Sequence, residues 1–392
     1  MRSPLEQDKN SNLCSNRDPV PEGALRVTYR LACSPAEAQS LAQALLLEQT
    51  VELPSHAVGR EALEKLGTIE SIHQKGKRSF EVHITYRWET LGGELPQALN
   101  VIFGNVSLWK NVRLVKLEPS PCLQGIFPGA RLGQAGLRET LGVEGRPLLC
   151  SALKPMGLDV SQLALLAAEL AAGGVDIVKE DHGLGNQPFA PFGERVYRCS
   201  ASIQDAASRT GKRTLYVPNV TAPMEEISSR ARLAKKAGAG GLLLCPGISG
   251  WDSVRMLATD PELGLPLFVH PALLGSFIAK PQSGFSPEVL FGTLPRLVGA
   301  DATIFPHWRS RFPFSRASCA RITNATREHL YIWKAIFPVP AGGIKLEELP
   351  TVLDFYGKDA ILLIGGSLLS HPEGLQRACS EIFSTIQKKF PS

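Results

Sequence analysis

Residues 175–182 read VDIVKEDH, and this stretch decides how the rest of the chain is interpreted. A run of apolar residues ends abruptly in a lysine, two carboxylates and a histidine. Because the side chains of a strand alternate between its two faces, Lys179 and Asp181 point to the same face. Charged groups where a parallel strand ends are typical of the catalytic mouth of a (β/α)8 barrel. The stretch therefore predicts a barrel strand whose end carries chemistry.

Short apolar runs separated by helical segments continue from residue 148 onward, which is the pattern of parallel βα repeats. We expect eight of these runs to be strands: 148–155, 175–181, 214–220, 241–247, 265–271, 301–306, 337–344 and 360–366. Residues 161–174 and 225–238 are expected to be helices between them. Eight such units predict a closed TIM barrel, which we assign to residues 148–385.

The chain before the barrel is expected to contain a disordered polar tail at 1–23 and a small ferredoxin-like α+β domain with a linker at 24–147. Within this domain we expect strands at 24–33, 79–88 and 98–107 and a helix at 36–49. The predicted fold class is therefore α/β, with a C-terminal barrel that follows a small N-terminal domain.

Composition excludes several classes of protein. The net charge of +5 is too small and too scattered to indicate a nucleic-acid partner. No run approaches the roughly 20 apolar residues of a membrane span. The eight cysteines include no CxxC pair, so they are expected to be reduced thiols of a cytoplasmic protein.

The predicted strands end in residues that could build a site. These residues are Lys154, Lys179, Asp181, His182, Asn219, Thr221, His270, His307, Arg309, Arg311, Gly342, Gly343, Gly365 and Gly366. Glycines after the last two strands can expose backbone N–H groups to a phosphate. Each residue alone also has a structural explanation, such as a solvated lysine, a core histidine, an ion pair or a turn glycine. Their shared position at one end of successive strands favours a site for a small phosphorylated substrate.

The segment GGVDIVKEDHGLGNQPF at 173–189 resembles, in order and spacing, a signature of the large chain of ribulose-bisphosphate carboxylase (RuBisCO). The similarity is closer to the RuBisCO-like proteins that share its fold, and it extends from about residue 24 to about 385. Collinear matches include FGNVSLWKNVRLVKLE at 103–118, GRPLLCSALKPMGL at 145–158, VPNVT at 217–221, FVHPAL at 268–273, PAGGI at 340–344 and GGSLLSHPEG at 365–374.

The resemblance implies roles for the residues at the matching positions. Lys179 would take up CO2 as a carbamate and bind Mg²⁺, with Asp181 as a second ligand. Lys154 would be an acid/base lysine, and His270 would lie near the substrate. The resemblance also implies that Gly342, Gly343, Gly365 and Gly366 hold a phosphate, and that Glu48 and Asn105 reach the active site of a neighbouring subunit in a homodimer.

Several positions depart from the carboxylase pattern. His182 stands where the family has a third metal-binding glutamate, so another divalent metal could replace Mg²⁺. Met156 replaces a lysine, and Pro271 replaces an arginine that binds a second phosphate. The loop after the sixth strand contains Arg309 and Arg311 but lacks the catalytic lysine. The resemblance therefore implies a RuBisCO-like protein and not a carboxylase.

Our main hypothesis is metal-assisted enediolate chemistry on a phosphorylated keto-sugar acid. The expected activity is that of a lyase, namely decarboxylation or C–C cleavage of a substrate of the 3-oxo-isoapionate-4-phosphate type. Arg309, Arg311 or His307 would be free to bind the substrate carboxylate.

Other functions remain open at this stage. One is an isomerase or enolase of a methylthioribulose phosphate or a diketo phosphate. The enolase ranks lower because its branch has an intact Lys-Asp-Glu metal triad and a lysine base where this chain has Asn105. The others are a non-catalytic regulatory protein and a metal-independent enzyme that uses Lys154 as a Schiff-base amine.

Overall fold

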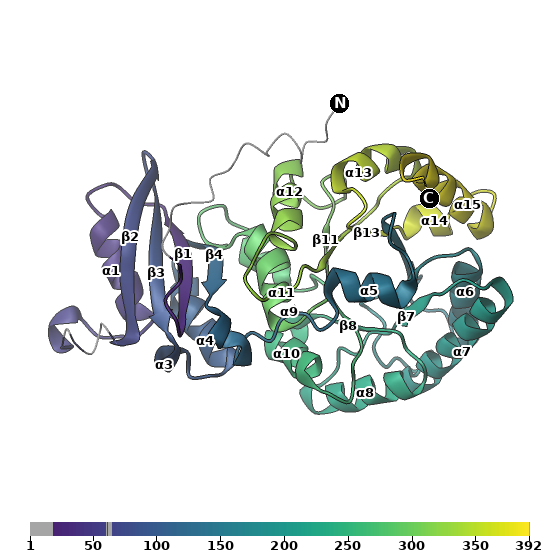
Figure 1. The fold of residues 1–392 in the computed structure, drawn as a ribbon, viewed down its shortest axis with the longest axis horizontal. Helices are drawn as coiled ribbons and strands as arrows, with labels where there is room; N and C mark the ends of the chain where they lie inside the picture. The colour runs from purple at the N-terminus through teal and green to yellow at the C-terminus, as the bar shows by residue number, and fades with distance from the viewer. Residues whose placement is uncertain (1–18, 60, 62–64, 392) are drawn as a thin grey trace.

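A computed structural model describes residues 19–391 except 60 and 62–64. The N-terminal sheet lies beside a ring of strands and helices formed by the rest of the chain (Figure 1). Residues 1–18 of the expected tail lie outside the described residues, whereas residues 19–23 lead through a turn into the first strand. No helix among the described residues is long and apolar enough to cross a membrane. The seven described cysteines are all free thiols, and only Cys122 is exposed.

The N-terminal domain has the predicted ferredoxin-like topology. Its main elements are β1 (Ala24–Leu31), α1 (Ala38–Glu48), β2 (Gly67–Gly76), β3 (Ser79–Arg87), α4 (Leu95–Phe103) and β4 (Val112–Pro119). The four strands are arranged in the order β4-β1-β3-β2, and neighbouring strands are antiparallel.

The prediction of a strand at 98–107 is wrong. These residues belong to α4 and to the 3-10 helix η3 (Asn105–Leu108). Leu95, Ala98 and Ile102 are buried, and their spacing of three and four residues places them on one side of a helix. The apolar composition of the segment was misleading because its periodicity is that of a helix.

All eight predicted barrel strands are present. They are β5 (Leu148–Leu153), β6 (Ile177–Glu180), β7 (Leu215–Val217), β8 (Leu242–Leu244), β9 (Leu267–Val269), β11 (Ala302–Pro306), β12 (Phe337–Ala341) and β13 (Ile361–Leu363). The strands pair in parallel as β13-β5-β6-β7 and β8-β9-β11-β12. A bridge between Asn219 and Leu243 joins the two groups on one side, and β12 lies beside β13 on the other. The TIM barrel is confirmed.

Helices surround these strands (Figure 1). They are α6 (Val160–Ala172), α7 (Phe192–Thr210), α8 (Met224–Lys236), α9 (Pro246–Ser249), α10 (Trp251–Thr259), α11 (Leu294–Val298), α12 (Arg316–Ala325), α13 (Leu349–Tyr356), α14 (Gly366–Leu369) and α15 (Leu375–Lys389). The helices expected at 161–174 and 225–238 correspond to α6 and α8. Helix α6 begins at a capping box, in which the Asp159 carboxylate accepts from the Gln162 N–H and the Gln162 side chain accepts from the Asp159 N–H.

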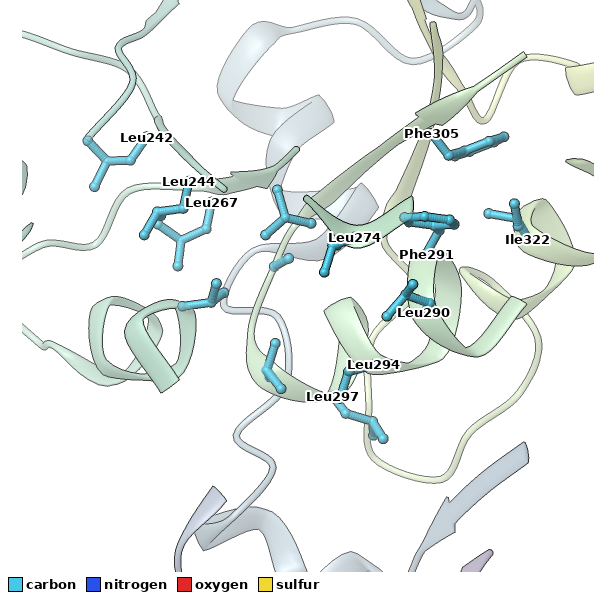
Figure 2. Packing of buried hydrophobic residues seen from close by; sticks show 14 of the residues in the cluster. Leu242, Leu244, Leu267, Leu274, Leu290, Phe291, Leu294, Leu297, Phe305 and Ile322 are labelled. Atoms are coloured by element: carbon cyan, nitrogen blue, oxygen red, sulfur yellow. The ribbon is translucent and has the colours of Figure 1, made fainter. Parts of the chain in front are cut away.

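Figure 2 shows how this helical layer packs against the barrel. Phe305 of β11 lies near Phe291 of the π-helical turn η6 (Val289–Thr293) and Ile322 of α12, whereas the leucines of β8 and β9 lie on the other side of the view. The labelled residues are Leu242, Leu244, Leu267, Leu274, Leu290, Phe291, Leu294, Leu297, Phe305 and Ile322. All of them are buried, so their contacts fix the positions of the strands whose ends form the mouth.

The expected linker contains a helix that packs against the inner side of the barrel. Leu137 and Leu141 of α5 (Gly133–Leu141) belong to the same apolar cluster as Leu148 and Ile177, near the beginning of β5 and β6. The buried Asp301 carboxylate accepts hydrogen bonds from the backbone N–H groups that begin α5. Because α5 covers the end where the strands begin, the opposite end is available for a site.

The barrel segment also contributes to the N-terminal sheet. Strand β10 (Gly284–Phe285) pairs in parallel with β4, and the Arg113 guanidinium donates to the Pro281 carbonyl at 2.5 Å. The division of the chain at residue 147 stays a prediction. The remaining short helices are α3 (Trp88–Leu91), η2 (Ser55–Ala57), η4 (Pro121–Gly125), η5 (Leu274–Ile278) and η7 (Leu346–Glu348).

Candidate active site

Asp181 is the centre of the candidate site. Lys154, which follows β5, forms an ion pair with its Oδ2, and His182 Nδ1 lies 2.9 Å from its Oδ1. The Gly183 N–H also donates to Oδ1, at 3.0 Å. Burial alone would raise the pKa of Asp181, but these hydrogen bonds and the charge of Lys179 outweigh it and hold the pKa well below its usual range. The carboxylate is therefore ionised at neutral pH.

Lys179 lies in the interior of the mouth and is only 3% exposed. Its ammonium group donates to the Glu180 carbonyl oxygen at 2.6 Å. Burial lowers the pKa of Lys179, and the nearby charge of Lys154 lowers it further. More of its amine is therefore neutral at physiological pH than in an exposed lysine, and only the neutral amine can react with CO2.

His270 follows β9 and stacks on His182, with ring centroids 4.0 Å apart and planes inclined by 11°. Burial and the charge of Lys179 hold the pKa of His270 well below its ordinary value, so its ring is neutral. The Ala272 N–H donates to His270 Nδ1 at 3.2 Å. With Nδ1 acting as the acceptor, Nε2 carries the proton and can donate to a bound molecule.

A buried ion pair holds the loop that carries these groups. The Glu180 carboxylate faces away from the mouth and binds the Arg195 guanidinium of α7, with Nε–Oε1 at 2.6 Å and both side chains 0% exposed. The Tyr216 hydroxyl and the Asn219 N–H also donate to this carboxylate, at 2.6 and 2.9 Å. The Asn219 amide donates to the carbonyls of His182 and Leu184, both at 3.0 Å. Sequence reasoning missed this cluster, although strand alternation places Glu180 opposite Lys179.

The glycines after β12 and β13 border open space. Gly342 and Gly343 have φ angles of +101° and +119°, which other residues rarely adopt. A Cβ atom placed on Gly343, Gly365 or Gly366 would have no neighbour within 4 Å. The backbones of Gly343, Gly365 and Gly366 are therefore open to a small molecule, whereas Gly342 lies against Ser310, and the phosphate-binding role of these glycines stays a prediction.

The three residues expected to bind a carboxylate lie in different surroundings. His307 is 0% exposed, and its Nδ1 lies 3.2 Å from the Tyr356 hydroxyl of α13. Burial and the charge of Arg309 lower the pKa of His307 to about 4. Arg309 pairs with Glu348 at 3.0 Å, and Arg311 is exposed with its guanidinium over the Phe312 ring. The buried position of His307 does not support its expected contact with substrate.

Glu48 and Asn105 lie together in the N-terminal domain, where the Asn105 amide donates to the Glu48 carboxylate at 3.1 Å. Within the described part of the chain, no hydrogen bond or ion pair links them to the lysines or histidines of the barrel mouth. Their expected role at the site of a neighbouring subunit stays a prediction.

The unmodified side chains do not form a complete metal site. Among the described residues, no group of three His, Cys, Asp or Glu side chains could hold a metal ion. Asp181 and His182 supply two adjacent donors, and a carbamate on Lys179 would supply the missing oxygen donor. The donor set therefore fits a divalent ion when Lys179 is carbamylated.

The fold is that of the RuBisCO large chain. The family model described as "Ribulose bisphosphate carboxylase large chain, catalytic domain" matches residues 133–308. The ribulose bisphosphate carboxylase-like protein 1 of Rhodopseudomonas palustris is 39% identical over 89% of this chain and 94% of its own length. The chain belongs to the RuBisCO large-chain family, and its relatives are RuBisCO-like proteins.

Other relatives have names that specify an activity. The 5-methylthioribulose-1-phosphate isomerase of Rhodospirillum rubrum is 35% identical over 92% of this chain and 96% of its own length. The 2,3-diketo-5-methylthiopentyl-1-phosphate enolase of Geobacillus thermodenitrificans is 35% identical over 84% of this chain and 80% of its own length. Among solved structures, a RuBisCO-like protein from Rhodopseudomonas palustris superposes with a TM-score of 0.85 at 33% identity, covering 95% of this chain and 99% of the other.

Proposed function

We propose that the chain is an isomerase that acts, through an enediolate, on a phosphorylated ketose of the 5-methylthioribulose-1-phosphate class. From the sequence alone, an isomerase was the alternative to the main hypothesis of decarboxylation or C–C cleavage. The names of the relatives favour the isomerase over that main hypothesis. The enolase is a weaker candidate because Asn105 occupies the position of that branch's lysine base. The observation that carries the proposal is the gathering of Lys154, Lys179, His182 and His270 around the Asp181 carboxylate.

Isomerisation requires a group that transfers a proton between two neighbouring carbon atoms. Lys154 is suited to this role because 44% of its side chain is exposed and its Nζ is oriented by Asp181. As the neutral amine it would take the proton from one carbon atom, and the ammonium so formed would return that proton to the neighbouring carbon. His270 would donate from Nε2 to a substrate oxygen and stabilise charge that develops there. These two residues therefore divide proton transfer and oxygen binding between them.

We also propose that a divalent ion binds to carbamylated Lys179, Asp181 and His182. Such an ion supplies polarisation of the carbonyl group and stabilisation of the oxyanion when bound. The lowering of the pKa of Lys179 by burial supports carbamylation because it favours the neutral amine. The proposed assembly is a homodimer, in which Glu48 and Asn105 complete the site of the neighbouring subunit.

The shape of the mouth supports a substrate with a single phosphate. The open glycines after β12 and β13 would bind that phosphate through backbone N–H groups. Met156 is 55% exposed, and its Cε lies 2.4 Å from the position a Cβ on Gly183 would take. This thioether therefore lies next to Asp181, where it favours an apolar substrate end over a second phosphate.

The test is turnover of 5-methylthioribulose 1-phosphate in D2O with bicarbonate and Mn²⁺, followed by NMR. We expect an isomeric ketose phosphate and incorporation of deuterium at carbon. Lys154→Met should lower kcat by about 100-fold or more, because it removes the proton-transfer group. Lys236→Met, at the exposed end of α8, is the matched control and should leave kcat unchanged. Equal rates in both variants, or no isomer with the wild type, would contradict the proposal.

A further inference from the structure

We infer that His182 is a metal ligand and that it makes the site prefer Mn²⁺ or Co²⁺ over Mg²⁺. The inference rests on the proposed function for the location of the metal, but it does not depend on the reaction. It concerns a position where this chain departs from the pattern that the resemblance implies, since His182 replaces a carboxylate with an imidazole.

The distance between His182 and Asp181 suits two neighbouring ligands of one ion. His182 Nδ1 and Asp181 Oδ1 are 2.9 Å apart. Two ligands that bind an octahedral ion at about 2.1 Å and at right angles lie about 3.0 Å from each other. An ion could therefore take the place of the proton between these two atoms with little movement of either side chain.

Neighbouring groups hold both donors in this orientation. The ring of His182 stacks on His270, and the backbone carbonyl of His182 is fixed by the Asn219 amide. The other oxygen of Asp181 is occupied by the Lys154 ammonium, which orients the carboxylate without covering Oδ1. Such outer contacts are typical of groups that orient metal ligands. At the same time, 42% of the His182 side chain is exposed, so an ion can reach it.

The chemistry of the donors then determines the preferred metal. Mg²⁺ selects oxygen ligands, whereas imidazole suits later divalent metals, and affinity for a given site rises from Mn²⁺ to Co²⁺. A carbamate and one aspartate carry two negative charges, which balance a divalent ion without a third carboxylate. Replacing the expected glutamate by imidazole therefore weakens Mg²⁺ more than Mn²⁺.

The alternative is that His182 only donates a hydrogen bond to Asp181 and never contacts a metal. Spectroscopy of bound Mn²⁺ distinguishes the two cases, because electron spin-echo modulation detects a directly bound nitrogen. The full-length chain would be stripped with a chelator and loaded with Mn²⁺ in the presence of bicarbonate. We expect nitrogen modulation in the wild type and in His270→Gln, and its loss in His182→Glu, which still binds Mn²⁺.

Competition between Mn²⁺ and Mg²⁺ provides the second measurement. The wild type should bind Mn²⁺ about tenfold or more tightly than Mg²⁺, and His182→Glu should reduce this ratio. Absence of nitrogen modulation in the wild type, its loss in His270→Gln, or no bound Mn²⁺ would overturn the inference even if His182→Glu does not fold. Isomerase turnover without nitrogen modulation would refute this inference alone, whereas modulation without turnover would refute only the proposed reaction.

Discussion

Replacing Arg195 with methionine is predicted to destabilise the barrel and loosen the candidate site together. The guanidinium of Arg195 makes two hydrogen bonds to the Glu180 carboxylate, at 2.6 and 3.2 Å. It also donates to the carbonyls of Gly185, at 2.8 Å, and Ala190. Methionine fills a similar volume but provides none of these donors. The substitution therefore leaves a carboxylate with 0% exposure without its counter-ion.

The expected magnitude follows from the burial of the pair. Removing one partner of a buried ion pair typically costs about 3–5 kcal/mol, because the remaining charge is no longer compensated. The Tyr216 hydroxyl and the Asn219 N–H still donate to Glu180, so we expect a value near the lower end, about 3 kcal/mol. This change corresponds to about a hundredfold shift in the unfolding equilibrium.

The assay is urea unfolding followed by tryptophan fluorescence, together with Mn²⁺ affinity. Arg209→Met is the matched control, because Arg209 forms an exposed pair with Asp205 on the same helix. That control should change the free energy of unfolding by less than about 0.5 kcal/mol and leave Mn²⁺ binding unaltered. If Arg195→Met cost less than about 1 kcal/mol, the buried pair would not be what holds the loop after β6.

Three further predictions concern the glycines, the buried histidine and the carbamate. Gly366→Ala should raise KM for the phosphorylated substrate about tenfold, which corresponds to about 1.4 kcal/mol, and should leave the melting temperature unchanged. Gly145 also faces open space, so Gly145→Ala is the control and should change neither KM nor the melting temperature. Burial lowers the pKa of His307 to about 4 in the folded chain, so the unfolded chain binds more protons between about pH 4 and 6.5. The free energy of unfolding, measured with urea, should therefore fall by about 2 kcal/mol from pH 7 to 5. His307→Phe should show a smaller fall, and an equal fall would contradict the assignment to His307. Lys179→Ala should abolish the bicarbonate dependence of Mn²⁺ binding in calorimetry, and a dependence that survives would exclude Lys179 as the site of the carbamate.

The sequence predicted the barrel well because its signals are local. Each strand is a short apolar run, and the charged or glycine residues that follow it need no knowledge of distant parts of the chain. Predictions failed where long-range packing decides the structure. Residues 98–107 belong to α4 and η3, and the buried side of α4 packs into the apolar core. The helix α5 in the expected linker is held by Leu137 and Leu141 against barrel residues. Asp301 accepts hydrogen bonds from the backbone at the beginning of α5, and it lies more than 150 residues away along the chain.

Strand alternation explains where the structure places the predicted site residues. Ile177 and Phe268 pack inside the barrel, so Lys179 and His270, two residues later, also face inward. In β11 the inward residue is Ile304, so alternation directs His307, three residues later, toward the helices, where it meets Tyr356.

The same alternation explains the one cluster that was missed. Glu180 lies between two inward residues and must therefore face α7, where only a cation from another element can compensate its charge. The sequence alone contains the direction of Glu180 but not the identity of its partner, because Arg195 is one of many cations on the predicted helices. A charged residue at an outward position of a buried strand is thus evidence for an ion pair that supports the site, and residues at inward positions are the ones to test for catalysis.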